Sequence, residues 1–200
     1  MVRYLNDCLL IKNILIIGDL HIGYDEQFHG KAIFPGSQLE EIIKKLKDVF
    51  KYLKKDKVKI TKIILLGDVK HDFGRITDIE WRETLQFFDF LRDNIEDKSR
   101  VIVIKGNHDN ILKPILKKRD IKLVNYLKIK IDGKRWCFLH GNRMFEQCLD
   151  SDCLVFGHLH PAITLSDKYK TEKYKCFLNG NWENKIIFVL PSFTNISYGY

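Results

Sequence analysis

The chain has little of what marks membrane and secreted proteins. Its 200 residues contain no apolar stretch that reaches the roughly 20 residues needed to cross a bilayer. The apolar N-terminus is interrupted by polar residues and has no small-residue cleavage site, so it does not resemble a signal peptide. We therefore expect a cytoplasmic protein with no membrane partner.

Cysteine pairs at short spacing are lacking, so the sequence suggests no pairing. The five cysteines form no CxxC motif, and their number is odd. Cys137 and Cys153 lie inside apolar runs, where a free thiol behaves as a small hydrophobic side chain. This pattern predicts reduced core cysteines and argues against both disulfides and a thiolate zinc site.

The composition is that of one folded domain spanning residues 1–200. Apolar residues make up 45% and charged residues 30%, which excludes a disordered chain. The net charge of +8 favours polyanionic partners such as nucleic acid. An equally good explanation is that the lysines coat the solvent-facing sides of helices, since one predicted helix carries many of them.

Two long helices and one short helix are predicted. Ser37 with Glu40, and Thr77 with Glu80, have the spacing of capping boxes. They predict one helix over 37–54 and a second that begins at Thr77. The apolar face of the second helix would be Trp81, Leu85, Phe88, Leu91 and Ile95. Pro114 predicts a short helix over 114–118.

Strands are expected on both sides of these helices and dominate after residue 120. The first half has the order βαβαβ, and the second half is expected to be mostly antiparallel, with hairpin turns at Asp132-Gly133 and Asn179-Gly180. The charged segment 167–175 alternates Lys and Tyr, which could stack on nucleic acid, although a solvated hairpin edge or loop is favoured. The expected strands are a hairpin at 8–17 and the segments 62–66, 101–105, 121–124, 126–131, 135–139, 153–157, 174–178 and 185–190.

Five short apolar runs each end at side chains that can bind a metal ion. An apolar run that stops at such a side chain, often beside glycine, indicates a buried strand that delivers a ligand at its carboxyl end. The runs are ILIIGDLH (14–21), KIILLGDV (62–69), VIVIKGNHD (101–109), WCFLHG (136–141) and CLVFGHLH (153–160). They supply Asp19, His21, Asp68, Asn107, His108, His140, His158 and His160.

This set of side chains predicts a shared site for two divalent metal ions. Oxygen and nitrogen donors without thiolate suit Mn, Fe, Zn, Ni or Co, of which we favour Mn. The donors exceed what one tetrahedral ion uses, so two ions are the economical interpretation. Asp68 is the candidate bridging ligand, which would hold the ions about 3.5–4 Å apart.

The order D-x-H, GD, GNHD, H and G-H-x-H resembles the signature of the calcineurin-like metallophosphoesterases. The resemblance covers Asp19 to His160, and every ligand position of the signature is filled. It implies an α/β fold, a four-layer αββα sandwich of two mixed β-sheets flanked by helices, with the metals at the strand ends.

The resemblance also implies a role for each motif residue. Asp19, His21 and His160 would bind one ion. Asn107, His140 and His158 would bind the other, with Asp68 between the two. His108 matches the family histidine that contacts the substrate phosphate and protonates the leaving group, and Asp109 would orient His108.

These features predict hydrolysis of a phosphoester, with a phosphodiester favoured and nucleic acid or a nucleotide as the candidate substrate. Two divalent ions lower the pKa of a bridging water, and the resulting hydroxide attacks phosphorus. One alternative is a cyclic-nucleotide or nucleotide phosphohydrolase. Another is a non-catalytic scaffold for protein interactions, which the intact ligand set and His108 argue against.

Within the family, the segments GDVKHDFG and LPSFTNISYGY are most similar to small prokaryotic phosphoesterases encoded beside DNA ligases and helicases, and to their archaeal relatives. This likeness implies a DNA-repair protein as a partner, and it leaves the oligomeric state open.

Three further residues are candidate substrate contacts. His71 stands where relatives often have an acid; it would contact substrate, hydrogen-bond a ligand or, as we favour, cap a loop. Asn142 and Arg143 follow His140 and would either reach a substrate phosphate or serve as a loop cap and a surface ion pair.

Overall fold

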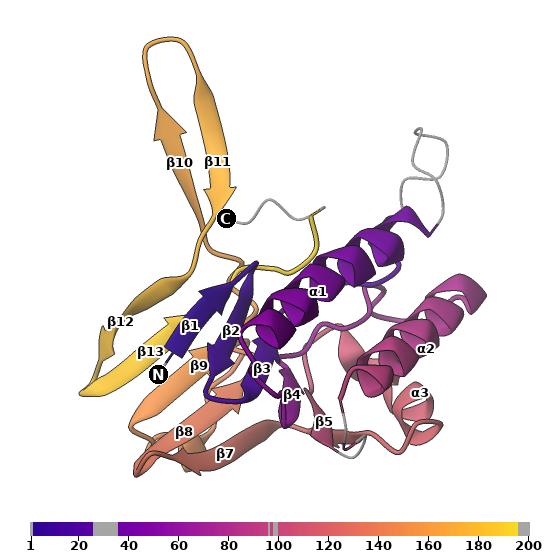
Figure 1. Ribbon diagram of the computed structural model, residues 1–200, viewed down its shortest axis with the longest axis horizontal. Helices are drawn as coiled ribbons and strands as arrows, with labels where there is room; N and C mark the ends of the chain where they lie inside the picture. Colours follow the sequence, from indigo (N-terminus) through magenta and orange to yellow (C-terminus); the bar gives the residue numbers. More distant parts are fainter. Residues whose placement is uncertain (1, 26–35, 96, 98–99, 196–200) are drawn as a thin grey trace.

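The computed structural model describes residues 2–25, 36–95, 97 and 100–195. Two β-sheets pack face to face, and helices cover the outer face of one of them (Figure 1). The expected α/β fold with two sheets is confirmed. The last five residues of the motif at 190–200 lie outside the described residues.

The first sheet has the strand order β1-β2-β3-β4-β5-β6. Strands β3 to β6 are parallel, whereas β1 and β2 form an antiparallel edge. The strands are β1 (Val2–Leu5), β2 (Cys8–Ile11), β3 (Ile14–Ile17), β4 (Lys62–Leu65), β5 (Val101–Ile104) and β6 (Lys122–Val124).

The second sheet has the order β12-β13-β9-β8-β7. Its three central strands are parallel and only its two edges are antiparallel hairpins, so the C-terminal half is less antiparallel than expected. The strands are β7 (Tyr126–Ile131), β8 (Lys134–Leu139), β9 (Cys153–Phe156), β12 (Leu178–Trp182) and β13 (Lys185–Val189).

A separate hairpin stands away from both sheets (Figure 1). It consists of β10 (Ala162–Ser166) and β11 (Thr171–Lys175). The charged segment 167–175 forms its turn and second strand, and Tyr169 at the turn is 88% exposed. The favoured expectation of a solvated hairpin is therefore confirmed.

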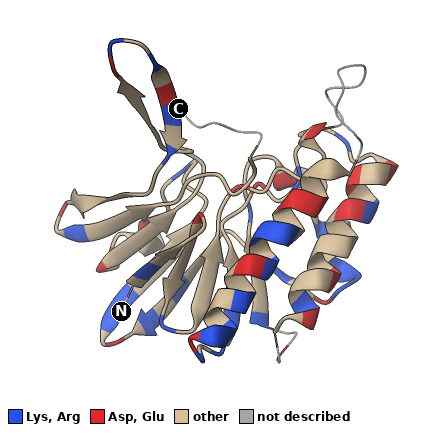
Figure 2. Cartoon of the chain, turned by 45° about the horizontal axis from the view of Figure 1, so that its top comes forward, with Lys and Arg blue, Asp and Glu red and all other residues tan. Residues whose placement is uncertain are grey.

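Within the described ranges, three α-helices and two short 3-10 helices have defined bounds at both ends. They are α1 (Ser37–Lys55), α2 (Asp78–Asp93), α3 (Lys113–Lys117), η3 (Asp109–Ile111) and η4 (Glu146–Cys148). Figure 2 shows basic and acidic residues interspersed along α1, so the positive charge of this helix is interrupted by negative charge.

The N-termini of α1 and α2 do not form the two predicted capping boxes. The predicted capping box at Ser37 is wrong, because the N-cap is Gly36, whose φ of 87° suits glycine. At α2, Thr77 does cap the helix by accepting from the Glu80 N–H at 3.0 Å. The Glu80 carboxylate, however, accepts from the N–H groups of His71 and Asp72 instead of closing a capping box.

The buried face of α2 is broader than the expected one. Phe88, Leu91 and Ile95 are buried as predicted, and Trp81 and Leu85 are partly buried and pack against the same core. Periodicity alone did not give the whole face, because Phe87 and the polar side chains of Glu80, Glu83 and Thr84 are buried as well.

Two further expectations are wrong. Asn179-Gly180 is not a turn: both residues lie inside β12, and the chain reverses at Glu183-Asn184, where φ is 45° and 62°. The predicted strand at 174–178 accordingly straddles the end of β11 and the start of β12. By contrast, Asp132-Gly133 forms the predicted turn between β7 and β8.

The cysteines are not all reduced. Cys137 of β8 and Cys148 of η4 form a disulfide, with their Cα atoms 5.7 Å apart. The expectation of free thiols failed for this pair because only the fold brings β8 and η4 together. Cys8 and Cys153 are buried free thiols, as expected.

The hydrophobic core has two main layers. One lies between the helices and the first sheet, and the other lies between the two sheets, where Ile64 and Phe138 are fully buried. The resemblance implied a layer of helices on the outer face of the second sheet. In the described residues, η4 and its loop pack on this face. No helix in the described ranges is long and apolar enough to cross a membrane.

Truncating the inter-sheet core should destabilise the protein strongly. Phe138→Ala leaves a cavity between the sheets, so we expect the free energy of unfolding to fall by about 3–5 kcal/mol in denaturant titrations. Tyr169→Ala, a truncation of an exposed aromatic ring, should change it by less than about 0.5 kcal/mol. A loss below about 1 kcal/mol for Phe138→Ala would contradict tight packing between the sheets.

Candidate metal centre

The predicted ligands lie together where strands of both sheets end. Three strands of the first sheet (β3, β4 and β5) and two of the second (β8 and β9) each stop one to three residues before a ligand. Parallel strands carry their carboxyl ends to the same edge of a sheet, which is where open α/β sheets bind ligands.

The backbone turns sharply at these strand ends. Five of the seven predicted ligands have a positive φ, a conformation that residues other than glycine rarely adopt. The φ angles are 37° at Asp19, 47° at His21, 49° at Asp68, 62° at His158 and 42° at His160. Each costs about 1–3 kcal/mol, and such strain is concentrated at functional sites.

Asp19 joins the first motif to the last. It is fully buried, and both of its carboxylate oxygens accept from the N–H of His158, at 2.9 and 3.1 Å. His160 Nε2 lies 3.2 Å from Asp19 Oδ1. Ser192 and Phe193 also donate to the Asp19 carbonyl, so the C-terminal segment closes over the same residue.

Asp68 occupies the middle of the cluster. Its Oδ1 accepts from the His108 N–H at 2.9 Å, and its carbonyl accepts from the N–H groups of Leu20 and His21. Oδ2 lies 3.3 Å from His140 Nε2 and 3.9 Å from His21 Nε2. Burial opposes ionisation of Asp68, but the histidine contacts outweigh it and lower the pKa to about 2.

His140 is held in one orientation. Its Nδ1 donates to the Leu66 carbonyl at 2.8 Å, and its Nε2 lies 2.9 Å from Asn107 Oδ1. Burial lowers the pKa of His140, but the adjacent Asp68 and Asp19 carboxylates outweigh burial and raise it to about 9. The negative potential at Nε2 therefore favours a positive charge there.

The side chains form two adjoining donor groups. Within each group the ligand atoms lie within 4.8 Å of one another: Asp19, His21 and His160, and Asp68, His140 and His158. Asn107 joins the second group through His140. His21 Nε2 is buried and has no hydrogen-bond partner among the described residues, and burial keeps the pKa of His21 well below its usual value. A neutral imidazole of this kind is the form that binds metal ions.

Two glycines permit this close packing. A Cβ on Gly157 would lie 2.6 Å from Asp19 Oδ2, and a Cβ on Gly106 would collide with the Asp68 carboxylate. The glycines in the GNHD and GHLH motifs thus make room for the two buried carboxylates.

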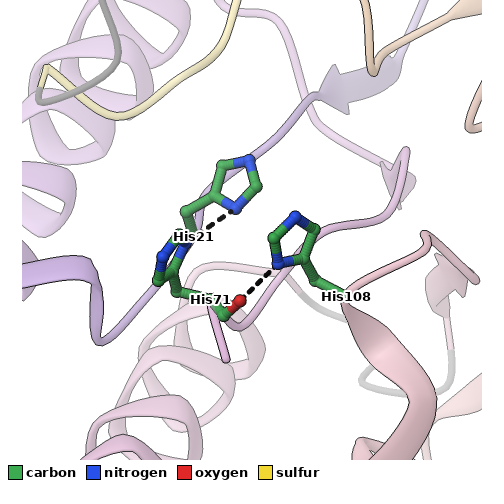
Figure 3. Close-up of side chains that lie close together, drawn as sticks. All are labelled: His21, His71 and His108. Carbon is green, nitrogen blue, oxygen red and sulfur yellow. Dashed lines mark hydrogen bonds between the residues drawn. The ribbon is translucent and has the colours of Figure 1, made fainter. Parts of the chain in front are cut away.

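His21, His71 and His108 form a third compact group (Figure 3). His71 Nδ1 lies 3.4 Å from His21 Nδ1, and His108 Nδ1 contacts the His71 carbonyl oxygen. The loop that holds His71 is fixed by Glu80, which accepts from the His71 N–H at 2.8 Å. His71 thus lies at the site, and its ring contacts the predicted ligand His21, which is one of the three roles suggested for it.

Asp109 does not orient the His108 ring, contrary to expectation. Its carboxylate accepts from the N–H groups of Val69 and Gly106, at 3.0 and 2.9 Å, and so ties the ends of β4 and β5 together. Burial raises the pKa of Asp109 to about 6. The ring of His108 is positioned instead by the His71 carbonyl.

The sequence motifs singled out some neighbours of the site and not others. Phe73 packs against His108 with ring centroids 3.5 Å apart. This exposed residue belongs to the GDVKHDFG segment, but the sequence predicted no role for it. Asn142 and Arg143 lie in the bend after His140. Among the described residues, no hydrogen bond or ion pair links either of them to the cluster.

The residues present fit divalent cations. The two groups combine buried carboxylate oxygens, an amide oxygen and imidazole nitrogens, a donor set suited to first-row transition metals. The first donor group includes His21 Nε2, which has no hydrogen bond within the described part of the chain. The second includes His140, whose surroundings favour positive charge.

Comparison with solved structures supports the fold. The nuclease MPE of Pseudomonas putida aligns with the whole chain and 85% of its own length, at 21% identity and a TM-score of 0.65. An archaeal phosphodiesterase aligns with 90% of the chain and 83% of its own length, at 15% identity and a TM-score of 0.45. Vps29 of Entamoeba histolytica aligns with 90% of the chain and 73% of its own length, at 19% identity and a TM-score of 0.43. At 21% identity, the likeness to the nuclease MPE is a likeness of fold.

A search of curated protein sequences finds no match to this chain. The sequence profile described as calcineurin-like phosphoesterase, in contrast, matches residues 12–178 and so includes every predicted ligand. The resemblance seen in the motifs is thereby confirmed. The chain belongs to the calcineurin-like phosphoesterase family.

Proposed function

We propose that the protein is a phosphodiesterase that depends on two divalent cations and acts on nucleic acid or a nucleotide. Family membership supports a metal-dependent phosphoesterase. The observation that carries the proposal is that two donor groups adjoin each other, with Asp68 Oδ2 near both His140 and His21. The net charge of +8 favours a polyanionic substrate.

In this proposal, one cation is held by Asp19, His21 and His160. The other is held by Asn107, His140 and His158, and Asp68 serves both. Among the metals that suit mixed oxygen and nitrogen donors, Mn is the one we favour. When bound, two such cations supply a water of lowered pKa and neutralise charge on the phosphoryl oxygens.

His108 is the proposed general acid. Its Nδ1 contacts the His71 carbonyl, which can only accept, so Nδ1 carries a hydrogen. Nε2 faces the cluster, 3.8 Å from Asp68 Oδ2. In the protonated ring, Nε2 can therefore give its proton to the departing oxygen. His71, Asn142 and Arg143 are proposed substrate contacts at the rim, and Asp109 supports the loop that carries His108.

We further propose that residues 1–200 form a single domain, that the protein is most similar to ligase- and helicase-associated enzymes, that it has a DNA-repair partner and that it is cytoplasmic.

A metal screen tests the proposal directly. We expect chelated protein to be inactive, and expect Mn to restore hydrolysis of bis(p-nitrophenyl) phosphate more than hydrolysis of the corresponding monoester. Ni, Co, Zn and Mg would be compared in the same assay. Failure of every metal to restore cleavage of either ester would contradict the proposed function.

His108→Ala should separate chemistry from metal binding. Because His108 is not among the proposed ligands, metal content measured by atomic emission should stay at two ions per chain. Turnover of a diester with a poor leaving group should fall about 10²–10⁴-fold, since general acid catalysis contributes about that much. Undiminished cleavage of that diester would mean that another group supplies the proton.

Asp68→Asn should remove metal and activity together. The amide keeps the shape of the side chain but loses the negative charge that both donor groups share. We expect metal content and turnover to fall in parallel, while circular dichroism shows a folded protein. Asp150→Asn, which changes an exposed carboxylate paired with Lys128, serves as the control and should alter neither. Two tightly bound ions in Asp68→Asn would argue against the shared role.

A further inference from the structure

A hollow on the outer face of the second sheet lies directly beside the second donor group. Two of its lining residues, Gly141 and Leu159, immediately follow His140 and His158 in the chain. The packing is close: a Cβ on Gly141 would lie 3.5 Å from His158 Cβ. The same two loops therefore contribute residues to both the hollow and the candidate metal centre.

The lining of this hollow is apolar yet reachable from solvent. It is formed mainly by Met144, Phe156, Leu159, Trp182 and Ile187. Leu159 is 52% exposed, Trp182 40% and Met144 39%. Large apolar side chains left partly exposed around a concavity mark a binding site more often than scattered ones do. We call this feature the Trp182 hollow.

A glycine lies opposite one lining residue of the hollow in the second sheet. Gly180 of β12 pairs with Ile187, and a Cβ at this glycine would meet nothing within 4 Å. The sequence had suggested that Gly180 belongs to a turn, but it lies inside a strand, where glycine often marks a place that a ligand approaches.

One cation lies among the lining residues. Arg143 has no carboxylate partner among the described residues, and its guanidinium carbon lies 4.6 Å from the centre of the Phe145 ring, which supports it. An apolar surface with one positive group at its margin is complementary to a ligand that joins a flat ring to an anion.

The size of the hollow limits what it can hold. Its volume is about 260 Å³. Pockets that bury whole drug-sized ligands measure about 300–1,000 Å³. The hollow therefore suits a single ring system, with the rest of the ligand outside it.

We infer that the Trp182 hollow binds one unpaired nucleobase of the substrate, next to the phosphodiester that the metal centre cleaves. The inference rests on the proposed function and adds a substrate class to it. Trp182 and Met144 contact the faces of the base, and Arg143 faces the neighbouring phosphate. A base within a duplex has both faces stacked, so the hollow selects single-stranded ends or nucleotides.

Thymidylyl-thymidine, which has one phosphodiester, provides the test. We compare it with analogues in which hydrogen replaces one base or both. Removing the base that enters the hollow should lower kcat/KM about 5- to 150-fold, the range that stacking of one base provides. Trp182→Ala should abolish most of this difference. Tyr169→Ala, which removes an exposed aromatic ring elsewhere, should preserve it. Met144→Ala provides a second variant of the hollow if Trp182→Ala does not fold.

Binding measured without turnover separates this inference from the proposed function. In the His108→Ala background, calorimetry should show that thymidylyl-thymidine binds at least about 5-fold more weakly when Trp182 is also Ala. If no diester is hydrolysed but this difference in binding is present, the proposed function is wrong and binding of a base in the hollow is supported.

Equal kcat/KM for all analogues would overturn base binding in the hollow and leave the proposed function intact. So would a Trp182→Ala variant that changes only self-association in sedimentation, because the hollow would then join two copies of the chain.

Discussion

Two buried carboxylates organise the functional edge of this protein. Asp19 and Asp68 both face the His140 ring, and their oxygens accept backbone N–H groups from loops that are distant in sequence. A buried carboxylate is costly unless it is hydrogen-bonded and balanced by positive charge. The loops that supply His108 and His158 are therefore held in place by the same acids that would bind cations, so the geometry of the site and its charge have a single origin.

The rest of the fold stabilises the strained backbone of this arrangement. Five ligands sit at left-handed backbone positions that an isolated loop would leave. They persist because each follows a strand anchored in the two packed layers of the core. Such a rigid base allows the loops to bend sharply over the strand ends. The second sheet contributes in another way: its loops after β8 and β9 form one side of the metal centre and one wall of the Trp182 hollow.

Local patterns in the sequence were sufficient for many elements but failed at particular ones. The runs before Asp19 and Asp68, the Asp132-Gly133 turn and the Thr77 cap depend on neighbouring residues, and all were predicted. The apparent turn at Asn179-Gly180 became a strand because β13 pairs with that segment. The role of Glu80 in fixing His71 was also not predictable, since its capping-box spacing concealed a contact with another loop.

The sequence by itself determined which chemical groups are available and that they stand at strand ends, because strand periodicity and motif order are local properties of the chain. Only the tertiary structure decided their mutual distances. The contact of Asp19 with His158 spans 139 residues, and the pairing of Cys137 with Cys148 needs η4 to pack on β8. The His108 ring contacts the His71 carbonyl, whereas Asp109 accepts from the Val69 N–H. This difference from expectation likewise depends on how two loops meet. Such contacts are set by the packing of the two sheets, which no short segment encodes.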